Sequence, residues 1–421
     1  MQQQVRAFEP WMMSNIATGA ATASFLTLLI PPFVTDVTGS AFRVGIVFAA
    51  MSLAAVAGPW IGKIADRTGR HRTIYVIAMF AMAGAFALLA VDANNARWSP
   101  LFGIILGLSY SAQGTIGPTF IVGAGLTHKQ MSGQLTAFSL TYPIGQVIGG
   151  LIVAAAQLAG LGTAPIFWIA AATIALLTLV SWPALSRPTA RLQAFVATQP
   201  DGTVGASADG AADGAPADVP AKRRPVALLA TVFGTFLFVV VLSSMGNNGL
   251  TSQLANILPS VYGFTAAGTS LLIALAGLLN IGTIVLAGIW MARSTAMTVF
   301  AAGTIIRAVG ALTMALVGLF TTPVLVLAAV AMLVTYQGTP IPRLAANELA
   351  VGLSERSAGQ SVGLYFASSA VGSVVGCLVT DVLADAVSYN SVNWFAGAAG
   401  LAAALLLVAL IPRARTRPRI G

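Results

Sequence analysis

The sequence predicts an all-α membrane protein with about twelve transmembrane helices, arranged as two related six-helix bundles. Hydrophobic residues make up 57% of the 421 residues and charged residues only 8%, whereas about 25% of the residues of a soluble protein are charged. Long apolar runs alternate with short polar segments along the whole chain. The content of 43 Gly and 20 Pro suits membrane helices, which pack closely through small residues and tolerate proline.

Each apolar run is long enough to cross the hydrocarbon core of a bilayer, which takes roughly 20 residues of helix. The spans must be helical because lipid offers no hydrogen-bonding partner to exposed backbone groups. The predicted spans cover residues 11–35, 43–62, 73–91, 99–124, 133–157, 165–186, 225–256, 265–291, 296–319, 323–349, 358–385 and 390–412.

Basic residues gather in alternate loops, beginning with the N-terminus. These loops contain Arg6, Lys63, Arg67, Arg70, Arg72, Lys129, Arg187, Arg191, Lys222, Arg223, Arg224, Arg293, Arg356, Arg413, Arg415, Arg417 and Arg419. Only Arg43 and Arg97 fall in the other set of loops. Because basic loops stay on the cytoplasmic side, we expect a protein of the cytoplasmic (inner) membrane with both termini in the cytoplasm.

Residues 187–224 are predicted to form a flexible cytoplasmic linker, because Ala, Gly, Asp and Pro dominate and large apolar residues are scarce. The linker separates an N-terminal bundle, residues 1–186, from a C-terminal bundle with a short basic tail, residues 225–421. Several residues recur in the same order in both halves: Gly114, Thr115 and Pro118 as Gly338, Thr339 and Pro342, and Gly145 and Gly149 as Gly372 and Gly376. The recurrence indicates a duplicated six-helix unit.

A charged hairpin, residues 62–72, lies between two apolar runs. Its pattern, Gly-x-x-x-Asp-Arg-x-Gly-Arg-x-Arg, resembles the loop between helices 2 and 3 of the major facilitator superfamily of secondary transporters. In that family the loop fastens the cytoplasmic side of the N-terminal half and is released during alternating access. The resemblance implies a gating role for Gly62, Asp66, Arg67, Gly69 and Arg70, with Asp66 accepting hydrogen bonds from a facing helix N-terminus or an arginine.

The second half has no equivalent hairpin, since Arg293 stands alone after the eighth span without a neighbouring aspartate. We expect the corresponding cytoplasmic latch to use Glu348 and Arg356 instead. The resemblance also implies two parallel six-helix repeats that rock about a central site.

The fifth span contains Tyr142-Pro143-Ile144-Gly145-Gln146-Val147-Ile148-Gly149-Gly150. This segment resembles the antiporter motif of the same family, whose core is Gly-Pro-x-x-Gly-Gly, except that Gln146 stands at the proline position. Two interpretations of Pro143, Gly145, Gly149 and Gly150 remain open. They are either an export signature or positions where small residues let helices pack closely.

Polar side chains concentrate in the first, fourth, seventh and tenth spans, which surround the central cavity in the resembled architecture. The predicted cavity residues are Asn15, Tyr110, Gln113, Asn247, Asn248, Gln253, Tyr336, Gln337 and Arg343. Amides and phenols suit a neutral or weakly charged polar solute bound through hydrogen bonds, although interhelical hydrogen bonds of about 0.6 kcal/mol each explain any single amide equally well. The segment 246–249, Gly-Asn-Asn-Gly, also predicts a broken or weakened helix. Tyr110 occupies the arginine position of a family motif associated with proton coupling, which argues against simple proton antiport.

Charged residues inside the spans are costly and therefore informative. Two central arginines without a matching acid, Arg307 and Arg343, indicate either an anionic group on the solute or a structural pairing with backbone carbonyls and Glu348. Arg343 is the better candidate for the solute, whereas Arg307, in a span that is peripheral in the resembled architecture, is the more structural of the two; both interpretations of Arg307 stay open. No carboxylate is predicted at a central depth, since Asp381 and Asp385 are placed near an outer end. Protons are therefore only one option for a coupling ion.

The residue content also excludes several classes of function. A single cysteine, Cys377, and two histidines predict no disulfide framework, no metal site, no cofactor and no enzyme. The net charge of +9 is accounted for by cytoplasmic loops rather than by nucleic-acid binding. The leading interpretation is a monomeric, ion-gradient-coupled exporter of a small organic solute, working by alternating access among membrane lipids. The alternative is uptake or facilitated transport of a sugar or organic anion by the same fold.

Overall fold

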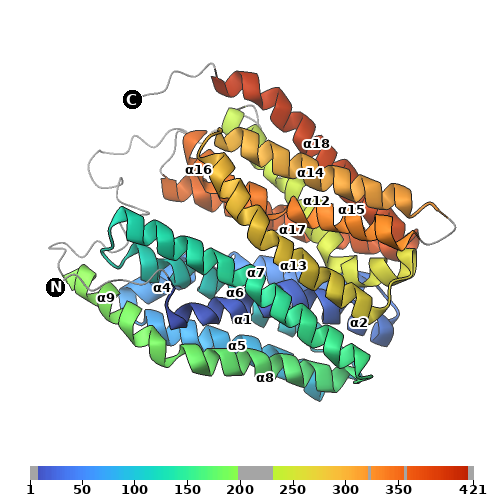
Figure 1. The fold of residues 1–421 in the computed structure, drawn as a ribbon, viewed down its shortest axis with the longest axis horizontal. Helices are drawn as coiled ribbons and strands as arrows, with labels where there is room; N and C mark the ends of the chain where they lie inside the picture. Colours follow the sequence, from blue (N-terminus) through green and yellow to red (C-terminus); the bar gives the residue numbers. More distant parts are fainter. Residues whose placement is uncertain (1–7, 198–230, 321–323, 355–357, 416–421) are drawn as a thin grey trace. The chain divides into compact units, whose positions relative to one another are not determined.

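The computed structural model describes residues 8–197, 231–320, 324–354 and 358–415, and the regular elements in these ranges are all helices. The chain forms two compact units (Figure 1). The first unit comprises Met1–Gly205, Leu254–Pro259 and Phe264–Ile281, and the second comprises Ala206–Gln253, Ser260–Gly263 and Gly282–Gly421. Helices α12 (Val232–Tyr262) and α13 (Ala266–Met291) therefore contribute residues to both units.

The first unit begins with a helix in which three conformations follow one another. Its segments are the 3₁₀ turn η1 (Pro10–Met12), α1 (Met13–Gly19), the π-helical η2 (Ala20–Phe25) and α2 (Leu26–Thr38). The remaining elements are α3 (Phe42–Ala55), α4 (Gly58–Thr68), α5 (His71–Val91), α6 (Ser99–Val122), α7 (His128–Leu158), α8 (Thr163–Ser181), η3 (Pro183–Leu185) and α9 (Ser186–Ala197).

The second unit contains the rest of α12 and α13 together with five further helices. These are α14 (Ala296–Val317), α15 (Leu325–Gln337), α16 (Pro340–Gly352), α17 (Ala358–Ala386) and α18 (Tyr389–Arg415). Helix α14 packs against α15, α16 and α18, so it occupies the middle of this group.

The helices agree with the predicted membrane fold. In the described part of the chain, 11 helical segments are long and apolar enough to cross a membrane. At the place of the fourth predicted span lies α6, an unbroken helix of 24 residues. The predicted all-α, multi-pass architecture is therefore confirmed.

The beginning of the predicted linker is helical, so the expectation of a flexible tether from residue 187 is wrong for its first part. Residues up to Ala197 form α9. Leu192 is 1% exposed, and its side chain occupies the space beside Gly123 at the end of α6. This apolar contact orders a segment whose composition alone predicts no structure. Residues 198–224 of the predicted linker lie outside the described ranges.

The charged hairpin is also shorter than predicted. Residues 62–68 continue α4, and the turn consists of Gly69 and Arg70, after which α5 begins at His71. The helix ends there because Gly69 adopts the left-handed conformation, with φ of 64°, which glycine reaches without steric cost.

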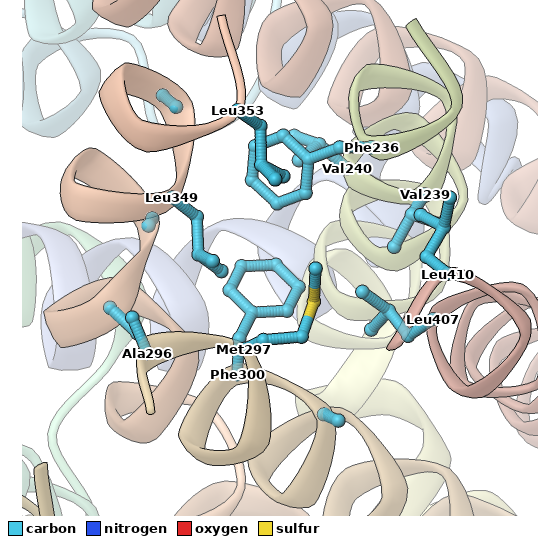
Figure 2. Packing of buried hydrophobic residues seen from close by; sticks show 14 of the residues in the cluster. Phe236, Val239, Val240, Ala296, Met297, Phe300, Leu349, Leu353, Leu407 and Leu410 are labelled. Carbon is cyan, nitrogen blue, oxygen red and sulfur yellow. The ribbon is translucent and has the colours of Figure 1, made fainter. Parts of the chain in front are cut away.

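A hydrophobic core holds the second unit together beside its polar site (Figure 2). Phe236 and Val240 come from α12, Met297 and Phe300 from α14, and the aliphatic side chain of Leu349 from α16. Figure 2 shows the α14 side chains pointing between α16 on one side and the α12 and α18 side chains on the other. The core fixes the spacing of the helices that carry the site.

Candidate functional site

A small polar pocket lies within the second unit, between α12, α14, α16 and α17. Its volume is about 60 Å³, room for a few water molecules or one small anionic group. The lining residues are Val240, Ser243, Ser244, Asn247, Asn248, Phe300, Arg307, Thr339, Pro342, Arg343, Tyr365 and Ser369. Two are arginines and, among the described residues around it, no carboxylate lines the pocket.

Arg307 on α14 is 7% exposed, and its guanidinium is held by α12. Its Nη2 donates a hydrogen bond to the Ser243 backbone oxygen at 2.9 Å and a second one to Ser243 Oγ. The backbone of Arg307 approaches Gly338 so closely that a Cβ at Gly338 would lie 2.7 Å from its nitrogen. The short distance between α14 and the end of α15 therefore depends on glycine.

Arg343 on α16 supplies the second positive charge of the pocket and lies close enough to Arg307 to act on it electrostatically. Two like charges this close repel each other. An anionic group placed between them would relieve this repulsion and accept charge-assisted hydrogen bonds from both guanidinium groups. The geometry therefore suits an anion.

The α12 side of the pocket carries amides and hydroxyls. Asn247 Oδ1 accepts a hydrogen bond from Thr339 Oγ1 at 3.1 Å. Asn248 Nδ2 donates to the Ser244 backbone oxygen at 3.1 Å and to Ser373 Oγ on α17 at 2.8 Å. Asn247 Nδ2 is the amide donor that could turn toward a bound solute.

The prediction of a broken helix at residues 246–249 is wrong, because α12 runs through this segment without interruption. The glycines serve close packing instead. A Cβ at Gly246 would lie 2.7 Å from the Ala396 backbone oxygen of α18, and one at Gly249 would lie 2.9 Å from the Gly376 backbone oxygen of α17. Small residues here allow neighbouring backbones to approach, as in many membrane helices.

Three of the predicted cavity residues, Asn247, Asn248 and Arg343, line the same pocket. Two others from the second unit make contacts elsewhere: Gln253 is fully buried beside Asp381, and Gln337 Oε1 accepts a hydrogen bond from Thr283 at 2.6 Å. Tyr336, next to Gln337, is half-buried at the end of α15.

The predicted cavity residues of the first unit bind neighbouring helices. Asn15 Nδ2 donates to the Phe138 backbone oxygen at 2.8 Å and to Thr141 Oγ1 at 3.0 Å. Gln113 is 2% exposed and accepts a hydrogen bond from Thr18. Tyr110 is half-buried on α6. These contacts match the interhelical role that was the alternative explanation for such amides.

Sequence reasoning missed part of the pocket. For Arg307 a structural pairing with backbone carbonyls was favoured and contact with an anionic solute was left open; the residue both binds the Ser243 backbone oxygen of α12 and lines the pocket. Ser244 and Ser369 were not predicted, although their hydroxyl oxygens lie 3.0 Å apart on facing helices. The spacing of Ser244 and Asn248, one helical turn apart, was the available signal, since residues at i and i+4 share a helix face.

At the end of α4, Asp66 Oδ1 lies 2.8 Å from His71 Nε2. The partner is therefore a histidine at the start of α5, rather than the facing helix N-terminus or arginine that was expected. The side chains of Arg67 and Arg70 are exposed, and Gly62 brings α4 close to Thr115 of α6. Of the other predicted latch, Glu348 is exposed on α16, while Arg356 lies outside the described residues.

Glu9 forms a polar cluster that the sequence did not reveal. Arg191 of α9 donates hydrogen bonds to both Glu9 carboxylate oxygens, at 2.7 and 2.6 Å. Gln134 of α7 donates to Glu9 Oε1 at 2.8 Å, and the Trp11 indole donates to Oε2 at 3.1 Å. The cluster ties α9 and α7 to the start of the chain.

The glycines of the antiporter-like segment lie where α7 crosses the first span. A Cβ at Gly145 would collide with the Ile16 backbone oxygen, and one at Gly149 would lie 2.8 Å from Ser24 Cβ. Pro143 lies inside α7, and a Cβ at Gly150 would lie 2.9 Å from Ala274 Cβ of α13. This geometry supports the packing interpretation and does not bear on the direction of transport.

Comparison with known proteins agrees with this fold. The sequence profile of the Major Facilitator Superfamily matches residues 11–351 and 236–420. The multidrug resistance protein MdtG of Escherichia coli strain K12 / DH10B is 26% identical over 185 residues, which are 43% of this chain and 43% of MdtG. The match thus spans less than half the length of this relative, and the same values apply to MdtG of strain O1:K1 / APEC.

Solved structures resemble nearly the whole chain. The nucleoside transporter NupG superposes with a TM-score of 0.71 at 15% identity, covering 95% of this chain and 98% of that one. The inward-open xylose transporter XylE from E. coli gives a TM-score of 0.72 at 13% identity, covering 96% and 95%. Identities this low establish the fold alone. With the profile matching most of the sequence, this chain belongs to the Major Facilitator Superfamily of secondary transporters, which are not enzymes.

Proposed function

We propose that this transporter recognises a small organic solute by its negative charge and moves it out of the cell. The observation that carries the proposal is the pocket that contains Arg307 and Arg343 with hydroxyl and amide groups around them. A buried cation without a counter-charge is costly, and a solute anion offers that counter-charge in the bound state.

The size of the pocket limits what can enter it. A volume of about 60 Å³ accommodates a carboxylate or a phosphate group but not an entire organic molecule, since ligand pockets usually measure about 300–1,000 Å³. The pocket therefore binds the charged end of the solute. Arg343, which is the more exposed of the two arginines, is the group that would meet the solute first.

Export across the cytoplasmic membrane, with both termini in the cytoplasm, is the direction we propose. The support is the similarity over part of the chain to a multidrug resistance protein and the partial antiporter motif of α7. We further propose that an ion gradient drives this movement and that the monomer is the functional form, as in the sequence-based interpretation.

A neutral polar solute taken up or facilitated by the same fold is the second candidate. It is favoured by the amides on α12, because Asn247 faces the pocket and its interaction partner is the uncharged Thr339. The two candidates differ in one respect that can be measured: only the first requires the positive charge of Arg343.

The test is a thermal-shift panel on purified protein, using matched pairs of a charged and an uncharged compound. Suitable pairs are benzoate with benzamide and glucose 6-phosphate with glucose. We expect at least one anion to raise the melting temperature of the parent protein while its neutral partner does not. In Arg343→Gln, the anion concentration needed for the same shift in melting temperature should rise about tenfold. The reason is that a hydrogen bond to a charged group contributes about 1.5–3 kcal/mol.

The matched control is Arg293→Gln, which removes an exposed arginine of the same unit outside the pocket. This variant should respond to anions as the parent does. Equal stabilisation of the parent and Arg343→Gln by every active anion would contradict the proposal. A panel in which only the neutral partners stabilise the parent would favour the second candidate.

A further inference from the structure

Asp381 is the only buried Asp or Glu in the described part of the chain, with an exposed fraction of 0%. It lies on α17 and faces α12, where its Oδ1 is 3.2 Å from Ser252 Oγ. The same oxygen is 3.2 Å from Thr380 Oγ1. Its second oxygen, Oδ2, has no hydrogen-bonding partner among the described residues. The sequence had placed this aspartate near an outer helix end.

The two hydroxyl groups near Asp381 have other acceptors. Each hydroxyl carries a single hydrogen. Ser252 Oγ lies 2.8 Å from the Gly249 backbone oxygen, and Thr380 Oγ1 lies 2.8 Å from the Gly376 backbone oxygen. Both distances are shorter than the 3.2 Å to Asp381. Gln253 contributes a side-chain hydrogen bond, but an ionised carboxylate accepts about four hydrogen bonds when fully satisfied.

The charges around Asp381 do not favour its ionised form either. Among the described residues it forms no ion pair. On α17 the titratable neighbours are the buried thiol of Cys377 and the carboxyl group of Asp385, about one turn away on either side. The facing α12 residues, Ser252 and Gln253, are uncharged. A second acid nearby adds repulsion to the cost of burying a negative charge.

Helices α12 and α17 approach each other closely about one turn before Asp381. A Cβ at Gly249 would lie 2.6 Å from Thr380 Cγ2 and 2.9 Å from the Gly376 backbone oxygen. A Cβ at Gly376 would collide with the Met245 backbone oxygen. The Oδ2 atom of Asp381 is itself buried, and an unpaired buried charge would cost several kcal/mol.

We infer that Asp381 binds an exchangeable proton, and that the resulting neutral carboxyl group joins α12 to α17. The joint is the last of three polar contacts between these helices, which follow one another at intervals of one turn on α12. The others are Ser244 with Ser369 and Asn248 with Ser373. Because Ser244 and Asn248 also line the polar pocket, loss of the proton would loosen a wall of that pocket. This last consequence, unlike the proton site itself, rests on the proposed function.

Infrared spectroscopy tests the proton site without any solute. A protonated carboxyl group has a carbonyl stretch separate from the bands of a carboxylate, and the stretch shifts when its hydrogen is replaced by deuterium. We expect a protonated-carboxyl band in the parent protein in lipid at about pH 7, above the usual ionisation range of aspartate. The band should be absent in Asp381→Asn, retained in the control Asp385→Asn, and shifted after transfer to deuterium oxide.

Thermal unfolding provides a second, independent readout. If the folded state holds one proton more than the unfolded state, its stability falls as the pH rises. The melting temperature of the parent should therefore drop by more than that of Asp381→Asn between about pH 6 and pH 8. Asp385→Asn should follow the parent.

Three results would overturn the inference. The first is a parent spectrum at neutral pH without the protonated-carboxyl band, or with the same band in Asp381→Asn. The second is a band that does not shift in deuterium oxide, which would mean that the proton does not exchange. The third is a melting temperature of the parent that is higher in sodium chloride than in choline chloride, with no such difference in Asp381→Asn. This result would mean that Asp381 binds a metal cation in place of the proton. None of these results depends on whether the pocket binds an anion.

Discussion

The two units contain matching seams between helices, and the seams differ in their chemistry. In the first unit, Gly145 of α7 contacts the Ile16 backbone oxygen of α1. In the second unit, the corresponding Gly372 and Gly376 of α17 contact the backbone oxygens of Val241 and Met245 in α12. In both seams glycine lets two backbones approach more closely than any side chain would allow.

The polar residues along the seams are not alike. In the first seam, Asn15 and Ser24 donate hydrogen bonds to the backbone oxygens of Phe138 and Gln146, and Asn15 also donates to Thr141 Oγ1. The second seam likewise contains side-chain pairs, but it includes the buried carboxyl group of Asp381 and opens into a pocket with two arginines. The difference indicates that the glycines set the packing of both units, while the ionisable residues give one unit its binding chemistry.

The largest expected effect comes from filling the glycine contacts. Gly145→Val and Gly376→Val should each prevent folding or destabilise the protein by about 3 kcal/mol or more, because the added atoms meet backbone that cannot move aside. Expression in the membrane fraction and the melting temperature of purified protein measure this effect. Gly133→Val and Gly363→Val are matched controls on α7 and α17, since a Cβ meets nothing within 4 Å at either position. Similar losses in all four variants would show that the two seams have no special role.

A smaller loss of stability is expected from Arg307→Gln. The change removes the donors that bind the Ser243 backbone oxygen and hydroxyl, and leaving buried acceptors unsatisfied costs about 1–3 kcal/mol. Arg343→Gln, at the exposed position of the same pocket, should shift the melting temperature much less. Chemical or thermal unfolding of the two variants side by side distinguishes them. Equal destabilisation would mean that Arg343 also holds the helices together.

The smallest expected losses of stability come from removing one amide side chain in each seam. Asn15→Ala and Asn248→Ala should each cost about 1 kcal/mol, since each removes hydrogen bonds between neighbouring helices. Only Asn248→Ala should also weaken the response to anions, because Asn248 lines the pocket and Asn15 belongs to the other unit. A loss of anion response in Asn15→Ala of the same size would contradict the division of roles between the units.

Much of the architecture could be predicted because hydrophobicity and charge vary along the chain on the scale of a whole helix. The membrane helices, the two glycine pairs of α7 and α17, and three pocket residues, Asn247, Asn248 and Arg343, follow from such patterns. What could not be predicted depends on which helices face one another. The role of Arg307 was left open because the sequence does not show that its helix packs against α12.

Asp381 is a second residue whose surroundings could not be predicted, because they also depend on which helices face one another. Its position in the sequence predicts a place near an outer helix end, and it does not show that α17 continues to Ala386 or that α12 covers the side chain. The helical start of the predicted linker was missed for a similar reason. The contact of Leu192 with the end of α6 and the ion pair of Arg191 with Glu9 are long-range interactions that composition does not record.

The most direct test of the proposed function is transport by purified protein in lipid vesicles. The probe is the radiolabelled anion that stabilises the parent most in the thermal-shift panel, with its neutral partner as the comparison. The account predicts saturable movement of the anion by the parent and by Arg293→Gln, and a loss of about tenfold or more in Arg343→Gln, as expected when a charge-assisted hydrogen bond is removed. Transport of the neutral partner at the same rate, or full activity of Arg343→Gln, would contradict recognition by charge.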